Sequence, residues 1–135
     1  MITFYDKNRK TVLKLNDFSS DNEIETRIKF SATISYAFYT ATRDCEDFKV
    51  YLEKFSNELK LLYNREIETA QFVPLERQIE IYFKQIEFGN ILATIKLNYL
   101  VTEYIKYDSS LVIQYESDQS FIPDLIAEIN SVLIL

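Results

Sequence analysis

Two kinds of side chain in this sequence have the chemistry for catalysis: the carboxylates and a single thiol. The carboxylates include closely spaced pairs, such as Glu66 with Glu68 and Glu116 with Asp118. In a cleft, two carboxylates can divide the roles of general acid and general base between them. However, 21 acidic residues in a chain of 135 produce such pairs by chance, so the spacing assigns them no catalytic role. We expect these residues to be solvated or to cap turns.

The thiol belongs to Cys45, and the chain contains no His. Cys45 falls at the expected first turn of a helix, where a thiolate is stabilised, but no imidazole is present to activate it. The lack of His also excludes Ser-His-Asp catalysis and most zinc sites, and one Gly cannot form a glycine-rich phosphate loop. We therefore predict no enzyme activity and no catalytic, cofactor or metal residues. A lone Cys and a charged N-terminal segment predict a cytoplasmic protein.

The alternation of polar and apolar residues predicts six to eight strands. The expected strands are Ile2–Tyr5, Thr11–Leu15, Glu25–Thr42 as one bent strand or two that meet near Thr33, Glu68–Val73, Arg77–Phe88, Ile91–Val101, and a strand after the turn at Asp108-Ser109-Ser110. Turn residues join the first two strands at Asp6-Lys7-Asn8-Arg9, and Gly89-Asn90 joins two of the later strands.

Two helices are expected between and after these strands. The first begins near Cys45 with Asp44 as its cap, ends at Asn64, and buries a stripe at three- and four-residue spacing. The second is capped by Ser120 or Asp118 and has Pro123 in its first turn.

Short connections between successive strands imply antiparallel pairing, because a parallel crossover needs about a dozen residues. We expect a single α+β domain over residues 1–135, with an antiparallel meander sheet of about six to eight strands and two helices packed on one face. The opposite face of the sheet is then open and is the natural place for a binding surface.

The charge is unevenly distributed along the chain. Residues 1–43 hold seven basic and five acidic side chains, whereas residues 44–135 hold eight basic and sixteen acidic ones. This balance argues against nucleic-acid binding and is compatible with a basic protein partner, although the charge taken alone is better explained by a solvated acidic surface. No apolar run approaches the length of a membrane span.

Ten Tyr residues add a second hint of a protein interface. Tyr is favoured at interfaces, but it is also a good strand former, so both interpretations stay open. The candidate partner-binding residues combine tyrosines with acidic residues of the C-terminal region: Tyr82, Tyr99, Glu103, Tyr104, Asp108, Tyr115, Glu116 and Asp118.

Several segments resemble the WapI-like family of bacterial immunity proteins. They are the run Gly89 to Leu97, the segment Asp118-Gln119-Ser120-Phe121 that opens the last helix, and the Phe-x-x-x-Leu spacing from Phe48 to Leu52. The resemblance implies a protein that binds and neutralises the C-terminal domain of a cognate polymorphic toxin, often an RNase or DNase, and it implies no catalytic residues. The Asp118-Gln119-Ser120 segment is either a helix cap or a contact site.

Two functions follow as hypotheses. The first is an immunity protein that blocks a basic toxin domain, expected to be a nuclease, by occlusion. The alternative is a non-catalytic scaffold or interaction domain that pairs with itself through a sheet face or an edge strand, and a homodimer stays open in either case.

Overall fold

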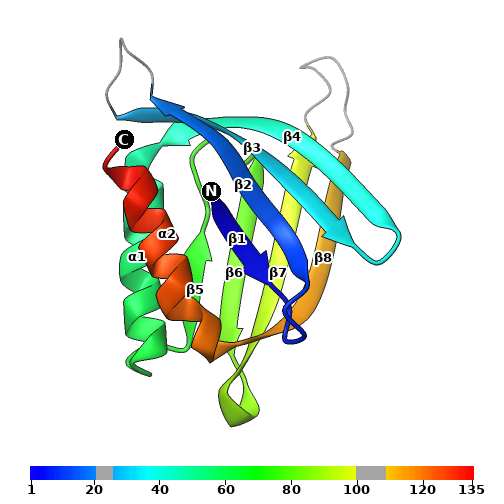
Figure 1. Ribbon diagram of the computed structural model, residues 1–135, viewed down its shortest axis with the longest axis vertical. Coiled ribbons are helices and arrows are strands. Elements are labelled where there is room, and N and C mark those ends of the chain that lie inside the picture. The colour runs from blue at the N-terminus through cyan, green and yellow to red at the C-terminus, as the bar shows by residue number, and fades with distance from the viewer. Residues whose placement is uncertain (21–25, 100–108) are drawn as a thin grey trace.

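The computed structural model describes residues 1–20, 26–99 and 109–135 (Figure 1). Within these ranges the chain forms eight strands, two α-helices and two short 3-10 turns. The strands are β1 (Ile2–Tyr5), β2 (Thr11–Ser20), β3 (Arg27–Tyr36), β4 (Tyr39–Phe48), β5 (Thr69–Phe72), β6 (Ile79–Gln85), β7 (Asn90–Tyr99) and β8 (Ser109–Asp118). The helices are α1 (Lys49–Tyr63) and α2 (Ile122–Leu133), and the 3-10 turns are η1 (Glu87–Gly89) and η2 (Gln119–Phe121).

The strands form two four-stranded antiparallel sheets, ordered β1-β2-β3-β4 and β5-β6-β7-β8. This confirms the α+β class, the meander order and the expected number of strands. The meander is divided in two because α1 intervenes between β4 and β5, so these two strands do not pair.

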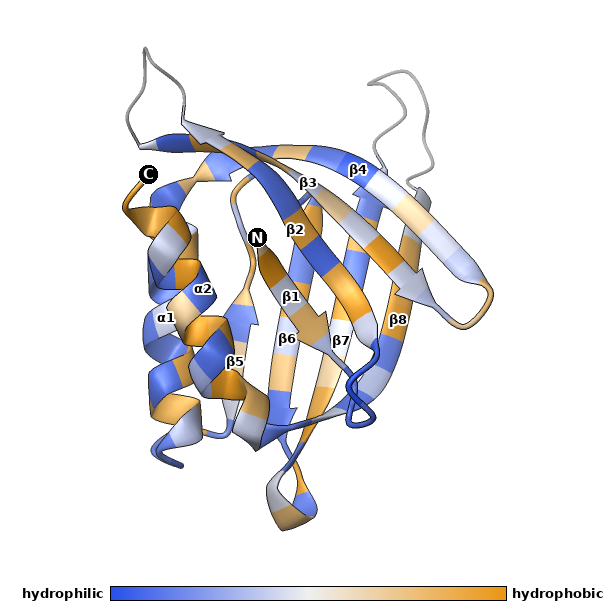
Figure 2. Ribbon diagram, in the orientation of Figure 1, coloured by the Kyte–Doolittle hydropathy of each residue, from blue (hydrophilic) through white to orange (hydrophobic). Residues whose placement is uncertain are grey.

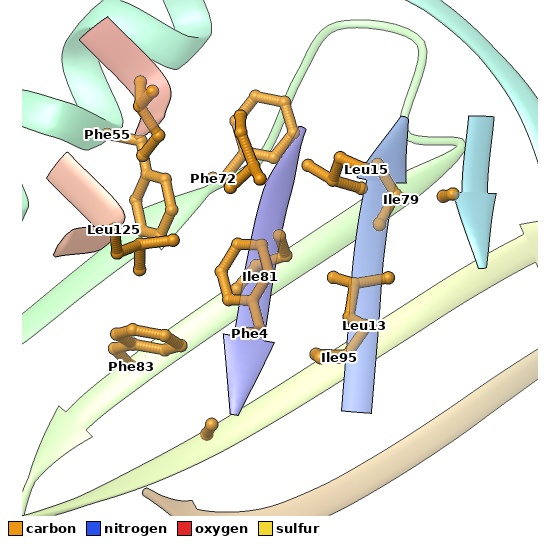
Figure 3. Close-up of a cluster of buried hydrophobic side chains, with 14 of the residues drawn as sticks. Phe4, Leu13, Leu15, Phe55, Phe72, Ile79, Ile81, Phe83, Ile95 and Leu125 are labelled. Carbon is orange, nitrogen blue, oxygen red and sulfur yellow. The ribbon is translucent and has the colours of Figure 1, made fainter. Parts of the chain in front are cut away.

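The two sheets pack face to face around a shared apolar core (Figure 3). Phe4 of the first sheet meets Phe83 of the second in an edge-to-face contact, with ring centroids 6.1 Å apart. Phe55 of α1 packs against Phe72 and Phe83, both from the inner face of the second sheet. Both helices therefore lie on one face of the second sheet, beside the first sheet (Figure 1), as expected from their single apolar stripes.

The apolar alternation correctly identified the inward-facing residues. Along β7, the residues Ile91, Ala93, Ile95 and Leu97 are buried, and the hydropathy colouring in Figure 2 shows the same alternation along the strands. In α1 the buried stripe contains Leu52, Phe55, Leu59 and Leu62, and in α2 it contains Ile122, Leu125, Ile129 and Val132.

The start of the first helix was predicted wrongly. Residues 44–48 continue β4, in which Asp44 pairs with Ser31 and Cys45 with Phe30, so Asp44 is not a helix cap. The helix starts at Lys49, whose N–H donates to the carbonyl of Thr26 at 2.7 Å. Long-range pairing with β3 outweighs the local capping preference of Asp44.

Two turn positions also differ from the prediction. The strands β3 and β4 meet at Ala37-Phe38 rather than near Thr33, because Arg27–Tyr36 pairs with Tyr39–Phe48 along its full length. Ser109 and Ser110 belong to β8 rather than to a turn, and they pair with Tyr99 and Asn98.

The N-terminal hairpin forms as predicted. Asp6 supplies the turn chemistry, because its Oδ1 accepts hydrogen bonds from the backbone N–H groups of Asn8 and Lys10 at 2.8 and 2.9 Å. In the part of the chain that the structure describes, no helix is long and apolar enough to cross a membrane.

Candidate functional site

The second sheet has an outer face that the helices and the first sheet leave uncovered. Cross-strand register places Gln71, Tyr82, Thr94 and Gln114 in one row across this face. Neighbouring rows hold Glu80 with Lys96 and Val112, and Lys84 with Leu92 and Glu116. We refer to these ten residues as the outer surface. It is the open sheet face expected from the sequence.

A buried carboxylate lies within the outer surface. The side chain of Glu80 is almost fully enclosed, and the residue is 5% exposed. Its Oε1 accepts a hydrogen bond from the Tyr82 hydroxyl at 2.5 Å, and its Oε2 accepts one from Asn98 Nδ2 at 2.8 Å. The Nζ of Lys96 lies 3.9 Å from Oε2. The carboxylate is thus buried but well supplied with donors.

The donors determine the protonation state of this group. Burial by itself would raise the pKa of Glu80, but the hydrogen bonds from Tyr82 and Asn98, helped by the charges of Lys96 and Arg77, outweigh it and hold the pKa below its ordinary value. Burial and the adjacent Glu80 carboxylate raise the pKa of the Tyr82 phenol to about 12. At neutral pH the site therefore carries an ionised Glu80 and a neutral Tyr82 held in fixed positions.

Three of the predicted partner-binding residues lie on or next to this face. Tyr82 is half-buried in the centre, and Glu116 is exposed on β8, where its Oε2 forms a 3.1 Å ion pair with Lys7. Asp118 follows at the end of β8.

Asp118 caps the 3-10 turn η2, which leads into α2. Its Oδ1 accepts a hydrogen bond from the Ser120 N–H at 2.8 Å, and this bond lowers the pKa of the Asp118 carboxyl. The next residue, Gln119, packs against Gly89, where an added Cβ would meet the Gln119 side chain at 3.1 Å. The Gly turn and the Asp-Gln-Ser segment are therefore one packed corner of the fold.

Tyr99 and Tyr115 lie elsewhere. Tyr99 is 60% exposed at the end of β7, where the Arg43 guanidinium stacks over its ring at 5.6 Å and also donates to the carbonyl of Asn98. Tyr115 points inward against Tyr36 and is 5% exposed, so the structure does not place it on a surface. Tyr115 is buried because alternate side chains of β8 point into the core, and position 115 is one of these.

The remaining candidates, Glu103, Tyr104 and Asp108, lie outside the described residues. Two residues of this candidate site, Glu80 and Asn98, were not singled out from the sequence. Both occupy polar positions in the alternation of β6 and β7, but their contact depends on the register in which these strands pair, which the Gly89-Asn90 turn does not specify by itself.

Cys45 has no features of a reactive thiol. It is buried in β4, and burial raises the pKa of its thiol to about 12. Among residues 1–20, 26–99 and 109–135, no group of three or more Cys, Asp or Glu side chains is arranged to hold a metal ion.

A comparison of the chain with models of protein families gives one match. Residues 11–134 match the family described as "Immunity protein WapI-like family". Searches of curated proteins and of solved structures returned no match.

Proposed function

The chain belongs to the immunity protein WapI-like family, and from this premise we propose that it neutralises a cognate toxin domain by binding it and blocking its working surface. The match to this family, over residues 11–134, is the observation that carries the proposal.

The net charge of −6 supports a basic partner. Nucleases hold phosphates with Lys and Arg side chains, so an acidic inhibitor is drawn to them by long-range attraction and can occupy the phosphate site. We propose a nuclease domain for this reason, and we propose that binding takes place in the cytoplasm of the producing cell.

The outer surface supports a contact role because it combines exposure with rigidity. Tyr82 presents an aromatic ring whose hydroxyl is already fixed by Glu80, so little side-chain entropy is lost when a partner covers it. Glu116 adds an exposed carboxylate on the same face. From the sequence we retain Glu103, Tyr104 and Asp108 as further proposed contacts.

We also propose that the chain acts by occlusion rather than by catalysis, as one unit over residues 1–135. The absence of His and the unreactive setting of Cys45 support this. Inhibition should then be stoichiometric, with one immunity protein required for each toxin domain.

The test uses the purified chain and the toxin domain encoded beside its gene. We expect a complex in calorimetry, loss of toxin activity at equimolar ratio, and affinity that falls as salt is raised. Tyr82→Ala should weaken binding by about tenfold or more, as expected for an aromatic anchor. The matched control is Tyr63→Ala, which removes an exposed tyrosine of α1.

Absence of both a complex and inhibition would refute the proposed function. Sedimentation of the chain alone provides the alternative outcome: a stable self-assembled species with no effect on the toxin would favour the scaffold hypothesis.

A further inference from the structure

Each sheet has two edge strands; helices cover two of these four edges, and a third edge, β4, is engaged at one residue. Along β1 lies α2, and the Thr3 N–H donates to Glu128 Oε1 at 3.1 Å (Figure 1). Along β5 lies α1, which packs against it through Phe55 and Phe72. The edge of β4 is partly blocked, because the Glu46 N–H donates to Gln78 Oε1 at 2.7 Å.

Among the described residues, the fourth edge, β8, is contacted at Glu116 and is otherwise unpaired over much of its length. Glu116 directs its carbonyl away from β7, since that oxygen accepts a hydrogen bond from the Lys7 N–H at 2.9 Å. The pairing of β7 with β8 has no register shift, so Val112 and Gln114 have the same backbone orientation as Glu116. Within the described residues, the outward N–H and C=O groups of Val112 and Gln114 make no hydrogen bond.

From Leu111 to Tyr115 this edge lacks most of the features by which proteins prevent strand pairing; its charged residues, Glu116 and Asp118, and the contact with Lys7 lie at its C-terminal end. Natural edge strands are protected by Lys, Pro, bulges or short length. In contrast, β8 is ten residues long, pairs regularly with β7, and has no Lys, Arg or Pro. Val112, on the outer face of this edge, is apolar and 55% exposed.

An aromatic hairpin tip lies beside the edge of β8. The ring of Tyr36, at the end of β3, is 6.3 Å from that of Tyr115 on the inner side of β8. From there the turn to β4 extends past β8, and Figure 2 shows its tip as hydrophobic. Phe38 at this tip is fully exposed and Tyr39 is mostly exposed, while Ala37 has a left-handed φ of 52°. Bulky apolar groups on a strained turn are costly unless a partner covers them.

Between β4 and the upper end of β8 there is an open hollow of about 310 Å³. It is lined by residues 41–43 of β4, 97–99 of β7 and 109–111 of β8. A strand added next to β8 would send alternate side chains toward the space between the two sheets. The hollow can receive one or two of these side chains.

We propose that the toxin docks by adding an extended strand to the edge of β8, with its inward side chains in the hollow and with Phe38 and Tyr39 packed against it. This inference rests on the proposed function and names the mode of contact. Main-chain hydrogen bonds to Val112 and Gln114 supply affinity, and the hollow and the aromatic tip supply selectivity. The strand belongs to the toxin rather than to a second copy, because two chains of charge −6 repel each other and β8 ends in the acidic residues Glu116 and Asp118.

The decisive variant is Val112→Pro. The N–H of Val112 points away from β7, so proline leaves the pairing of β7 with β8 intact while it removes an edge donor and obstructs an incoming strand. Val112→Thr is the matched control, since it keeps the N–H and the strand propensity. A second variant, Phe38→Ser, changes only a fully exposed side chain in a turn.

With the toxin domain encoded beside the gene as the probe, Val112→Pro and Phe38→Ser should each weaken binding by about tenfold or more. Val112→Thr should bind like the parent chain. Amide exchange measured by NMR should show that Val112 and Gln114 exchange rapidly in the free protein and become protected in the complex.

The outcomes separate this inference from the function on which it rests. If the parent chain neither binds nor inhibits the toxin, the proposed function fails. If the parent chain binds and both Val112→Pro and Phe38→Ser bind equally well, the edge contact is wrong and the function stands. A parent dimer that Val112→Pro converts to a monomer would assign the edge to a second copy and overturn the toxin strand. If Val112→Pro does not fold, the edge contact is tested by the other two measurements. It is wrong if Phe38→Ser binds like the parent chain and if Val112 and Gln114 gain no protection from amide exchange in the complex.

Discussion

The hydrogen bond from Tyr82 to Glu80 should stabilise the fold measurably. Tyr82→Phe removes only the hydroxyl, which lies 2.5 Å from Glu80 Oε1. The buried carboxylate then keeps Asn98 and the more distant Lys96 as partners of its other oxygen, Oε2. Within the described residues, Oε1 loses its donor.

The size of the effect follows from this geometry. A hydrogen bond to a charged group contributes about 1.5–3 kcal/mol to stability. Tyr82 is only half-buried, so water can partly replace its hydroxyl, and we expect a loss at the lower end, about 1.5–2 kcal/mol. For a domain of this size that corresponds to a fall in Tm of about 5–7 °C.

The effect should also depend on pH in a definite direction. The folded-state pKa of Glu80 is lowered, so the stability it contributes is present above the ordinary glutamate pKa and is lost as the pH falls through the folded value. The difference between the parent chain and Tyr82→Phe should therefore be full at pH 7 and narrow below about pH 4.

Urea unfolding of both proteins between pH 3 and pH 7 measures this difference, and Tyr63→Phe on α1 serves as the control. Equal stability of the two proteins at pH 7 would refute the assigned hydrogen bond. A difference that does not narrow at any pH down to the acid unfolding of the two proteins would show that Tyr82 acts through packing rather than through the Glu80 charge.

Three further substitutions test the core and the turns. Phe55→Ala, which empties the space between Phe72 and Phe83, should lower the free energy of unfolding by about 3–5 kcal/mol in urea titrations. Gly89→Ala should lower it by about 1 kcal/mol, because Gly89 has a φ of 73°, and a thermal melt with no decrease in Tm would contradict this. Asp118→Ala should cost about 1 kcal/mol through loss of the cap, and calorimetry would show whether the melting of the variant shifts accordingly.

Much of the architecture follows from local sequence patterns. Alternating residues such as Ile91, Ala93 and Ile95 are all buried, and the turn at Asp6 forms through the expected side-chain bonds. These features are predictable because side-chain direction alternates along any strand and because an Asp side chain bonds to its own turn.

The candidate site was predictable only in part. Tyr82 and Glu116 were identified from residue type and lie on one open face, whereas Tyr115, chosen by the same criterion, points into the core. Residue type alone does not show which face of a strand a tyrosine occupies. The alternation of β8 does, because Tyr115 shares its register with Leu111 and Ile113, which face inward.

By itself the sequence determined the α+β class, the antiparallel order, the two amphipathic helices and the absence of His-based chemistry. The tertiary structure alone decided that β4 continues through Cys45, that the meander divides into two facing sheets, that Glu80 is buried, and that Val112 and Gln114 of β8 have no strand partner on their outer edge within the described residues. The first group depends on the periodicity and identity of residues close together in the chain. The second depends on which distant strands and helices pair or pack, and there the long-range contacts outweigh the local preferences.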